Sequence, residues 1–116
     1  MRPERTSKTL EDIRDAASFV LAATEGKALG DYSEDRLLRQ AVERNFEIIG
    51  EAVGRLARND PESASCLSEH ERIVAFRNIL IHGYDLVDDD LVWDTIQTKL
   101  PVLLSEIEEL LKRESP

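Results

Sequence analysis

The residues best suited to chemistry stand close together, between Arg77 and Tyr84. Arg77 falls within the apolar pattern of a predicted helix, where a charge is costly unless it has a partner or faces a crevice. A guanidinium can hold a phosphate with a fork of two hydrogen bonds, and a histidine such as His82 can exchange a proton near neutral pH. The residue types leave one question open, which is whether Arg77 and His82 could meet around a single ligand.

Each of these residues also has a structural interpretation. On a continuous helix His82 would lie about 140° round the axis from Arg77 and about 7.5 Å along it. The two would therefore meet around one ligand only if the helix ends near His82 or a second chain contributes. Otherwise Arg77 would form a salt bridge with an acid such as Glu47 or Glu51. His82 would satisfy a carbonyl at a helix end, and Tyr84 would close the end of the bundle.

The elements that must position these residues are predicted to be helices. Only five Gly, four Pro and six aromatic residues occur, which disfavours a β-sandwich. Apolar residues recur at helical spacing in four segments, approximately 9–24, 33–58, 68–82 and from 88 onward. A polar loop through Ser68 follows the second helix, Gly83 would stop the third, and Pro101 would kink the last. The expected fold is all-α, an antiparallel bundle of four to five helices.

The length of 116 residues fits one domain, 1–116. The net charge of −9 argues against long nucleic-acid contacts, so no DNA partner is expected. Residues 36–77 are nevertheless rich in arginine, with seven Arg against seven acids, which leaves room for a local phosphate site. No apolar run is long enough to span a membrane, no secretory signal is seen, and a lone Cys66 fits a reducing compartment. A cytoplasmic protein without a membrane partner is expected.

Other candidate residues point to structure. Cys66 and His70 are four residues apart but lack two further ligands for zinc, and Asp88–Asp90 are explained by helix capping, so no metal is expected. Gly50 and Gly54 predict a close approach between helices. Asn45 falls on an apolar stripe, where a buried amide would set the register or the geometry of a dimer.

The stretch Arg-Asn-Ile-Leu-Ile-His-Gly-Tyr at 77–84 resembles the Arg-x4-His-x-Tyr motif of HepT-like toxins in the HEPN superfamily. Residues 41–52 resemble that family's second helix and residues 92–101 its last, so the resemblance runs from about 10 to 111. Residues 68–71, Ser-Glu-His-Glu, depart from the Pro- or Trp-containing entry expected before the third helix. That departure concerns the conformation of the loop before the third helix and does not affect the motif.

This resemblance implies a HEPN-like homodimer that acts as a metal-independent endoribonuclease without a cofactor. Arg77 and His82 of both copies would line a shared cleft. Arg77 would hold the RNA phosphate and stabilise developing charge, and His82 would serve as general base or acid. Asn78 would orient one of these residues or the RNA substrate.

Tyr84 occupies the family's regulatory position. The resemblance implies the toxin of a type VII-like HepT/MntA toxin–antitoxin pair, neutralised when an MntA-like minimal nucleotidyltransferase antitoxin transfers AMP to Tyr84. The added phosphate and bulk would take the place of RNA phosphate beside Arg77. Two alternatives stay open: a non-catalytic nucleotide- or substrate-binding subunit for the nucleotidyltransferase, and a structural helical dimer with a vestigial motif. The intact motif favours the toxin, whereas the net charge of −9 favours the alternatives.

Overall fold

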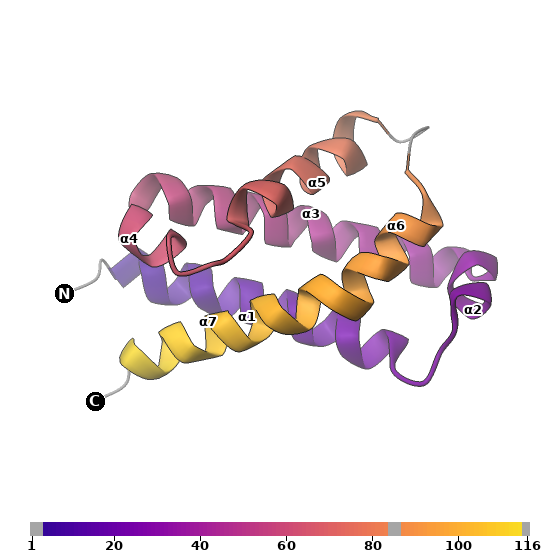
Figure 1. Ribbon diagram of the computed structural model, residues 1–116, viewed down its shortest axis with the longest axis horizontal. Helices are drawn as coiled ribbons and strands as arrows, with labels where there is room; N and C mark the ends of the chain where they lie inside the picture. Colours follow the sequence, from indigo (N-terminus) through magenta and orange to yellow (C-terminus); the bar gives the residue numbers. More distant parts are fainter. Residues whose placement is uncertain (1–3, 84–86, 115–116) are drawn as a thin grey trace.

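The computed structural model describes residues 4–83 and 87–114, and these residues are helical almost throughout (Figure 1). The long helices are α1 (Glu4–Thr24), α3 (Arg36–Asn59) and α5 (His70–His82), followed by a continuous segment of α6 (Asp89–Asp94), the π-helical turn η2 (Thr95–Lys99) and α7 (Leu100–Glu114). The short helices α2 (Leu29–Glu34) and α4 (Pro61–Ala64) lie between the long ones. No strand occurs in the described ranges. The predicted all-α architecture is confirmed.

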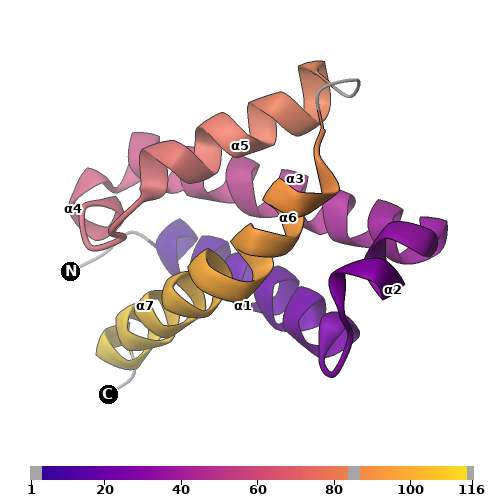
Figure 2. The ribbon, with the colours of Figure 1, turned by 45° about the vertical axis from the view of Figure 1, so that its right-hand side comes forward.

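The helices are arranged around α1 and α3. α1 packs against both α3 and α7, whereas α5 packs mainly against α3. Figures 1 and 2 both show α5 running along α3, apart from α1 and α7. The helix that carries Arg77 and His82 therefore lies at the edge of the bundle.

None of the described helices contains a stretch long and apolar enough to cross a membrane.

α3 is the central support of the fold because its apolar residues recur every three or four positions and form one stripe. The stripe is buried along its length, at Val42, Phe46, Ile49, Val53 and Leu56. The helix begins where the Asp35 carboxylate accepts a hydrogen bond from the Leu38 N–H at 3.0 Å, a standard N-cap. A helix with a stripe this wide can pack on two neighbours, here α1 and α5.

The first helix and the predicted loop after the second helix both differ from expectation. α1 begins at Glu4, five residues before the expected start, and buried Thr6 donates through Oγ1 to Asp60 Oδ2 at 3.0 Å. The predicted loop through Ser68 contains α4, because Asp60 also accepts from the Ser63 N–H at 3.2 Å and caps that helix. Asp60 therefore joins the N-terminal part of α1 to the corner between α3 and α4.

The expected long helix from residue 33 is also shorter at its start. Residues Leu29–Glu34 form α2 instead, and the Tyr32 side chain is fully buried against Trp93, with ring centroids 5.6 Å apart. Sequence periodicity missed α2 because six residues are too few to show a helical stripe.

The last helix starts as predicted and is irregular one turn before Pro101. Asp88 caps α6 by accepting from the Asp90 N–H at 2.9 Å. Where a kink is expected, the chain forms a π-helical turn, in which the Leu100 N–H bonds to the Thr95 carbonyl. Proline has no N–H for the carbonyl four residues back and crowds it, and the wider π-turn relieves that crowding.

Candidate functional site

The C-terminal half of α5 carries the predicted site residues. The helix ends at His82, where the Gly83 N–H bonds to the Ile79 carbonyl at 2.9 Å, so the predicted helix stop is confirmed. Leu80 is buried and anchors this half to the core, while Ile81 and His82 are exposed. This ending is one of the two conditions under which Arg77 and His82 could serve one ligand.

The stem of Arg77 lies directly on the backbone of α3. A Cβ atom built on Gly50 would lie 2.2 Å from Arg77 Cβ and 2.6 Å from Arg77 Cγ. Gly54 is less crowded, because its nearest contact on α5 would be Val74 Cγ2 at 3.8 Å. The predicted close approach of helices is therefore confirmed at Gly50, and its partner is the arginine of the motif. The spacing of Gly50 and Gly54 in the sequence indicates a close approach but does not identify this partner.

The head of Arg77 has an unusual environment for an arginine. Nη1 donates to Asn78 Oδ1 at 2.9 Å, while Nε is buried and has no hydrogen-bond partner. No ion pair of Arg77 is found in residues 4–83 and 87–114. A guanidinium that no carboxylate neutralises can receive an anionic ligand.

The two acids expected to pair with Arg77 pair elsewhere. Glu47 lies 3.3 Å from Arg44 Nη1 and Glu51 lies 3.5 Å from Arg55 Nη2, each on α3 itself. The structural alternative, a salt bridge from Arg77 to Glu47 or Glu51, is therefore not found in this part of the chain, because residues three or four apart on one helix face each other.

The other site residues are only partly placed. Asn78 and His82 are exposed on α5, and no hydrogen bond between Arg77 and His82 is found within the described ranges. Tyr84, the predicted modification site, lies outside the described residues. The structure thus brings Arg77 and Asn78 together and leaves His82 at the helix end.

The segment that departs from the expected entry to α5 is held by the last helix. The Ser68 N–H donates to the Glu106 carboxylate at 3.1 Å, and Glu69 pairs with Lys99 at 3.3 Å. These contacts position the start of α5 without a proline or tryptophan.

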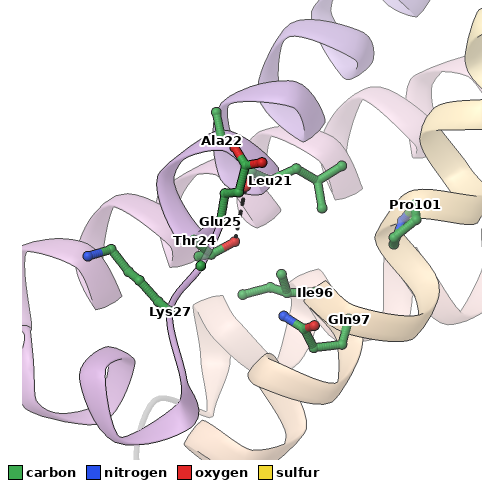
Figure 3. A pocket seen from close by; sticks show the side chains of 9 residues that line it. Leu21, Ala22, Thr24, Glu25, Lys27, Ile96, Gln97 and Pro101 are labelled. Atoms are coloured by element: carbon green, nitrogen blue, oxygen red, sulfur yellow. Dashed lines mark hydrogen bonds between the residues drawn. The ribbon is translucent and has the colours of Figure 1, made fainter.

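Two cavities are not lined by the predicted catalytic residues. A groove of about 490 Å³ runs between α5, α3 and the α6–α7 segment and is lined by apolar side chains that include Phe46, Phe76 and Ile79. A second cavity of about 420 Å³ lies between the end of α1 and the π-turn, near Thr24 and Pro101 (Figure 3). Neither cavity is lined by Arg77 or His82. Sequence reasoning missed both, since their walls come from separate helices.

A second group of titratable residues lies around Tyr32. Burial raises the pKa of the Tyr32 hydroxyl, which has no hydrogen-bond partner among the described residues, and Glu43 and Asp89 add to the rise. Burial also raises the pKa of Glu43, and the nearby Asp89 carboxylate raises it further. Nothing in the sequence pattern signalled this group, because its members come from α2, α3 and α6.

The remaining candidates have structural explanations. Asn45 donates through Nδ2 to the Ala41 carbonyl at 2.8 Å, so its amide bonds to its own helix. Cys66 is exposed, and His70 is the first residue of α5. Across the described ranges, no three His, Cys, Asp or Glu side chains gather in a group that could hold a metal ion.

Comparison with known proteins gives a consistent family match. A family model described as "Ribonuclease HepT-like" matches residues 9–110. A protein named "Putative RNase" from Caldanaerobacter subterraneus subsp. tengcongensis is 34% identical over 105 residues, covering 90% of this chain and 93% of that protein. "Probable ribonuclease HepT" from Thermococcus cleftensis is 32% identical over 106 residues, covering 89% of this chain and 93% of that protein. No solved structure is significantly similar to this chain.

Proposed function

Because this chain belongs to the HepT-like ribonuclease family, we propose that it is a metal-independent endoribonuclease whose active site is built from Arg77, Asn78 and His82 on α5. The observation that carries the proposal is the Arg77 head, which has no carboxylate partner among the described residues and stands on the same helix as His82. Arg44 and Arg55, by contrast, each pair with an acid on α3, and Arg72 pairs with Glu69, the residue just before α5.

The chemistry requires only groups that the chain supplies. The ribose 2′-oxygen attacks the adjacent phosphorus, the bond from phosphorus to the 5′-oxygen breaks, and a 2′,3′-cyclic phosphate and a 5′-hydroxyl result. His82 acts as base toward the 2′-hydroxyl or as acid toward the leaving oxygen. Arg77 binds the nonbridging oxygens and stabilises the charge that develops on them.

The proposal includes a homodimer. A single chain offers one His82, whereas this reaction moves a proton at both the attacking and the leaving oxygen. Two copies facing each other across their α5 helices would place two Arg77 and two His82 residues in one cleft. The exposed fractions of Ile79 (39%) and Ile81 (38%) support an association there, because large apolar side chains on α5 stand beside the motif.

We further propose that the protein is the toxin of a type VII-like toxin–antitoxin pair, neutralised by AMPylation of Tyr84 by an MntA-like nucleotidyltransferase. The chain has two tyrosines, and Tyr32 is fully buried, so only Tyr84 is left as a tyrosine acceptor in the folded protein. Incubation with the nucleotidyltransferase and ATP should add the mass of AMP to the wild type and to Tyr32→Phe but not to Tyr84→Phe. An equal gain in Tyr84→Phe would identify a different acceptor.

The test of the ribonuclease is RNA cleavage and growth arrest on induction without the partner. The wild type is expected to arrest growth in cells and, as purified protein, to cleave RNA in the presence of EDTA. The variants Arg77→Ala and His82→Ala are expected to do neither. Arg44→Ala and His70→Ala are matched controls, because they remove an exposed arginine of α3 and the histidine at the opposite end of α5. Both controls should behave as the wild type.

If the wild type and both site variants neither arrest growth nor cleave RNA, the proposal of a ribonuclease is contradicted. The second candidate, a nucleotide- or substrate-binding subunit for the nucleotidyltransferase, would then account for the fold, and the net charge of −9 already favours it. Affinity for that enzyme and for ATP would become the quantities to measure.

A further inference from the structure

We propose that Gly50 is a positioning residue for this site: it lets the Arg77 stem lie against α3 and so determines which edge of the guanidinium faces RNA phosphate. The inference rests on the proposed function, since it concerns the same arginine.

The need for glycine at position 50 is a need for space. The only described glycine with a positive φ is Gly26, so the backbone at Gly50 would accept any residue. A methyl group there would lie 2.2 Å from Arg77 Cβ, an atom that the α5 backbone holds in place. Ordinary contacts to a Cβ are 3.4–4 Å, so α5 would have to move away from α3 by about 1 Å.

This close packing limits what Arg77 can offer to a ligand. Its Nε atom is buried without a partner, and one of the two hydrogens on Nη1 is donated to Asn78 Oδ1 at 2.9 Å. The edge formed by Nε and Nη2 is therefore closed to a phosphate. The end of the guanidinium, where the two Nη groups lie side by side, is the edge that can form the fork.

Gly50→Ala is expected to lower the cleavage rate by between about tenfold and a hundredfold per folded molecule, because a displacement near 1 Å disturbs a reacting geometry by that much. Gly54→Ala is the matched control. It changes the same residue type one turn along α3, where the added methyl would meet Arg58 Nη1 at 3.5 Å and Val74 Cγ2 at 3.8 Å. Those are ordinary contacts, so Gly54→Ala should cleave as the wild type.

The experiment measures single-turnover cleavage of a fluorescent, mixed-sequence single-stranded RNA and binding of its 2′-O-methyl analogue. The proteins are the wild type, Gly50→Ala, Gly54→Ala, Arg77→Ala and the double variant, each corrected for its folded fraction by urea unfolding. If Gly50 acts through Arg77, the double variant cleaves and binds no worse than Arg77→Ala alone.

The outcomes separate the two proposals. Wild-type cleavage by Gly50→Ala would overturn the positioning role and leave Arg77 in place. A double variant weakened by the product of the two single effects would assign Gly50 a general structural role instead. Wild-type cleavage by Arg77→Ala would overturn the proposed role of the arginine itself.

If Gly50→Ala does not fold, a measurement on the wild type tests the orientation of the Arg77 guanidinium. The Arg77 Nε–H is buried, whereas the side chains of Arg44 and Arg72 are 68% and 77% exposed. By ¹⁵N NMR, the Arg77 Nε proton should exchange with water at least about tenfold more slowly than those of the two exposed arginines. Exchange as fast as theirs would overturn the inference.

Discussion

The side chains of Arg77 and Asn78 are joined by a hydrogen bond of 2.9 Å, from Nη1 to Oδ1. Neighbours in a helix point about 100° apart, so this contact requires the arginine head to bend round the helix surface. The stem of Arg77 stays where it is, because its Cβ and Cγ atoms pack against α3 at Gly50. The pair therefore defines where the positive charge of the site is presented.

Asn78→Ala should lower RNA cleavage by about tenfold, because the Arg77 head loses a neutral partner that orients it. Asn78→Asp should lower cleavage further, since a carboxylate at that position would neutralise the guanidinium and compete with RNA phosphate. Cleavage rates of both variants at equal folded concentration check this order. Wild-type activity in Asn78→Asp would show that the contact has no role in the reaction.

Thr6→Val should lower the free energy of unfolding by about 1–3 kcal/mol, since it leaves the buried Asp60 carboxylate without one of its donors. Urea unfolding followed by circular dichroism measures the loss. Thr98→Val is the matched control, because Thr98 is exposed and donates to the Asp94 carbonyl of its own helical segment. Its effect should stay within about 0.5 kcal/mol. Equal losses of unfolding free energy in the two variants would mean that the hydrogen bond between Thr6 and Asp60 stabilises the fold no more than an exposed one does.

Glu43→Gln should raise the stability at neutral pH and leave it unchanged in acid. Burial and the neighbouring Asp89 raise the pKa of Glu43 in the folded protein, so the folded state holds this proton more tightly than the unfolded state. Its contribution to stability is therefore fully present below the ordinary pKa of glutamate and is lost as the pH rises through the raised pKa. Urea unfolding across the pH range tests this dependence. A stability gain that is equal at every pH would exclude the titration of Glu43 as its cause.

Ile81→Gln should increase the fraction of monomer, because the proposed dimer would bury this exposed apolar side chain beside the motif. A shift of about tenfold or more in the dissociation constant is expected for one large apolar side chain. Light scattering across a concentration series measures it. Leu37→Gln is the control, since Leu37 is 81% exposed at the start of α3. Equal weakening by both variants, or by neither, would place the interface elsewhere.

Much of the helical framework was predictable because helices are specified locally. The stripe of α3, the Asp88 cap and the stop at Gly83 all depend on residues within about one or two turns of each other, and each was read correctly. The motif from Arg77 to Tyr84 could be identified for the same reason, since its residues lie close together in the sequence.

The partners of those helices were not predictable from one sequence. Thr6 and Asp60 lie 54 residues apart, and their contact ties the early start of α1 to the residue that caps α4. A pattern can show that residues share a face, but it cannot show which face of another helix they meet.

The helical class, the position of the motif and a glycine suited to close packing all follow from the order of the residues. That this glycine meets Arg77, and that Glu47 and Glu51 pair with other arginines, follows only from how the folded helices pack. The physical reason is that local hydrogen bonds define each helix, whereas the rotation and spacing of two packed helices follow from the fit of all their side chains together.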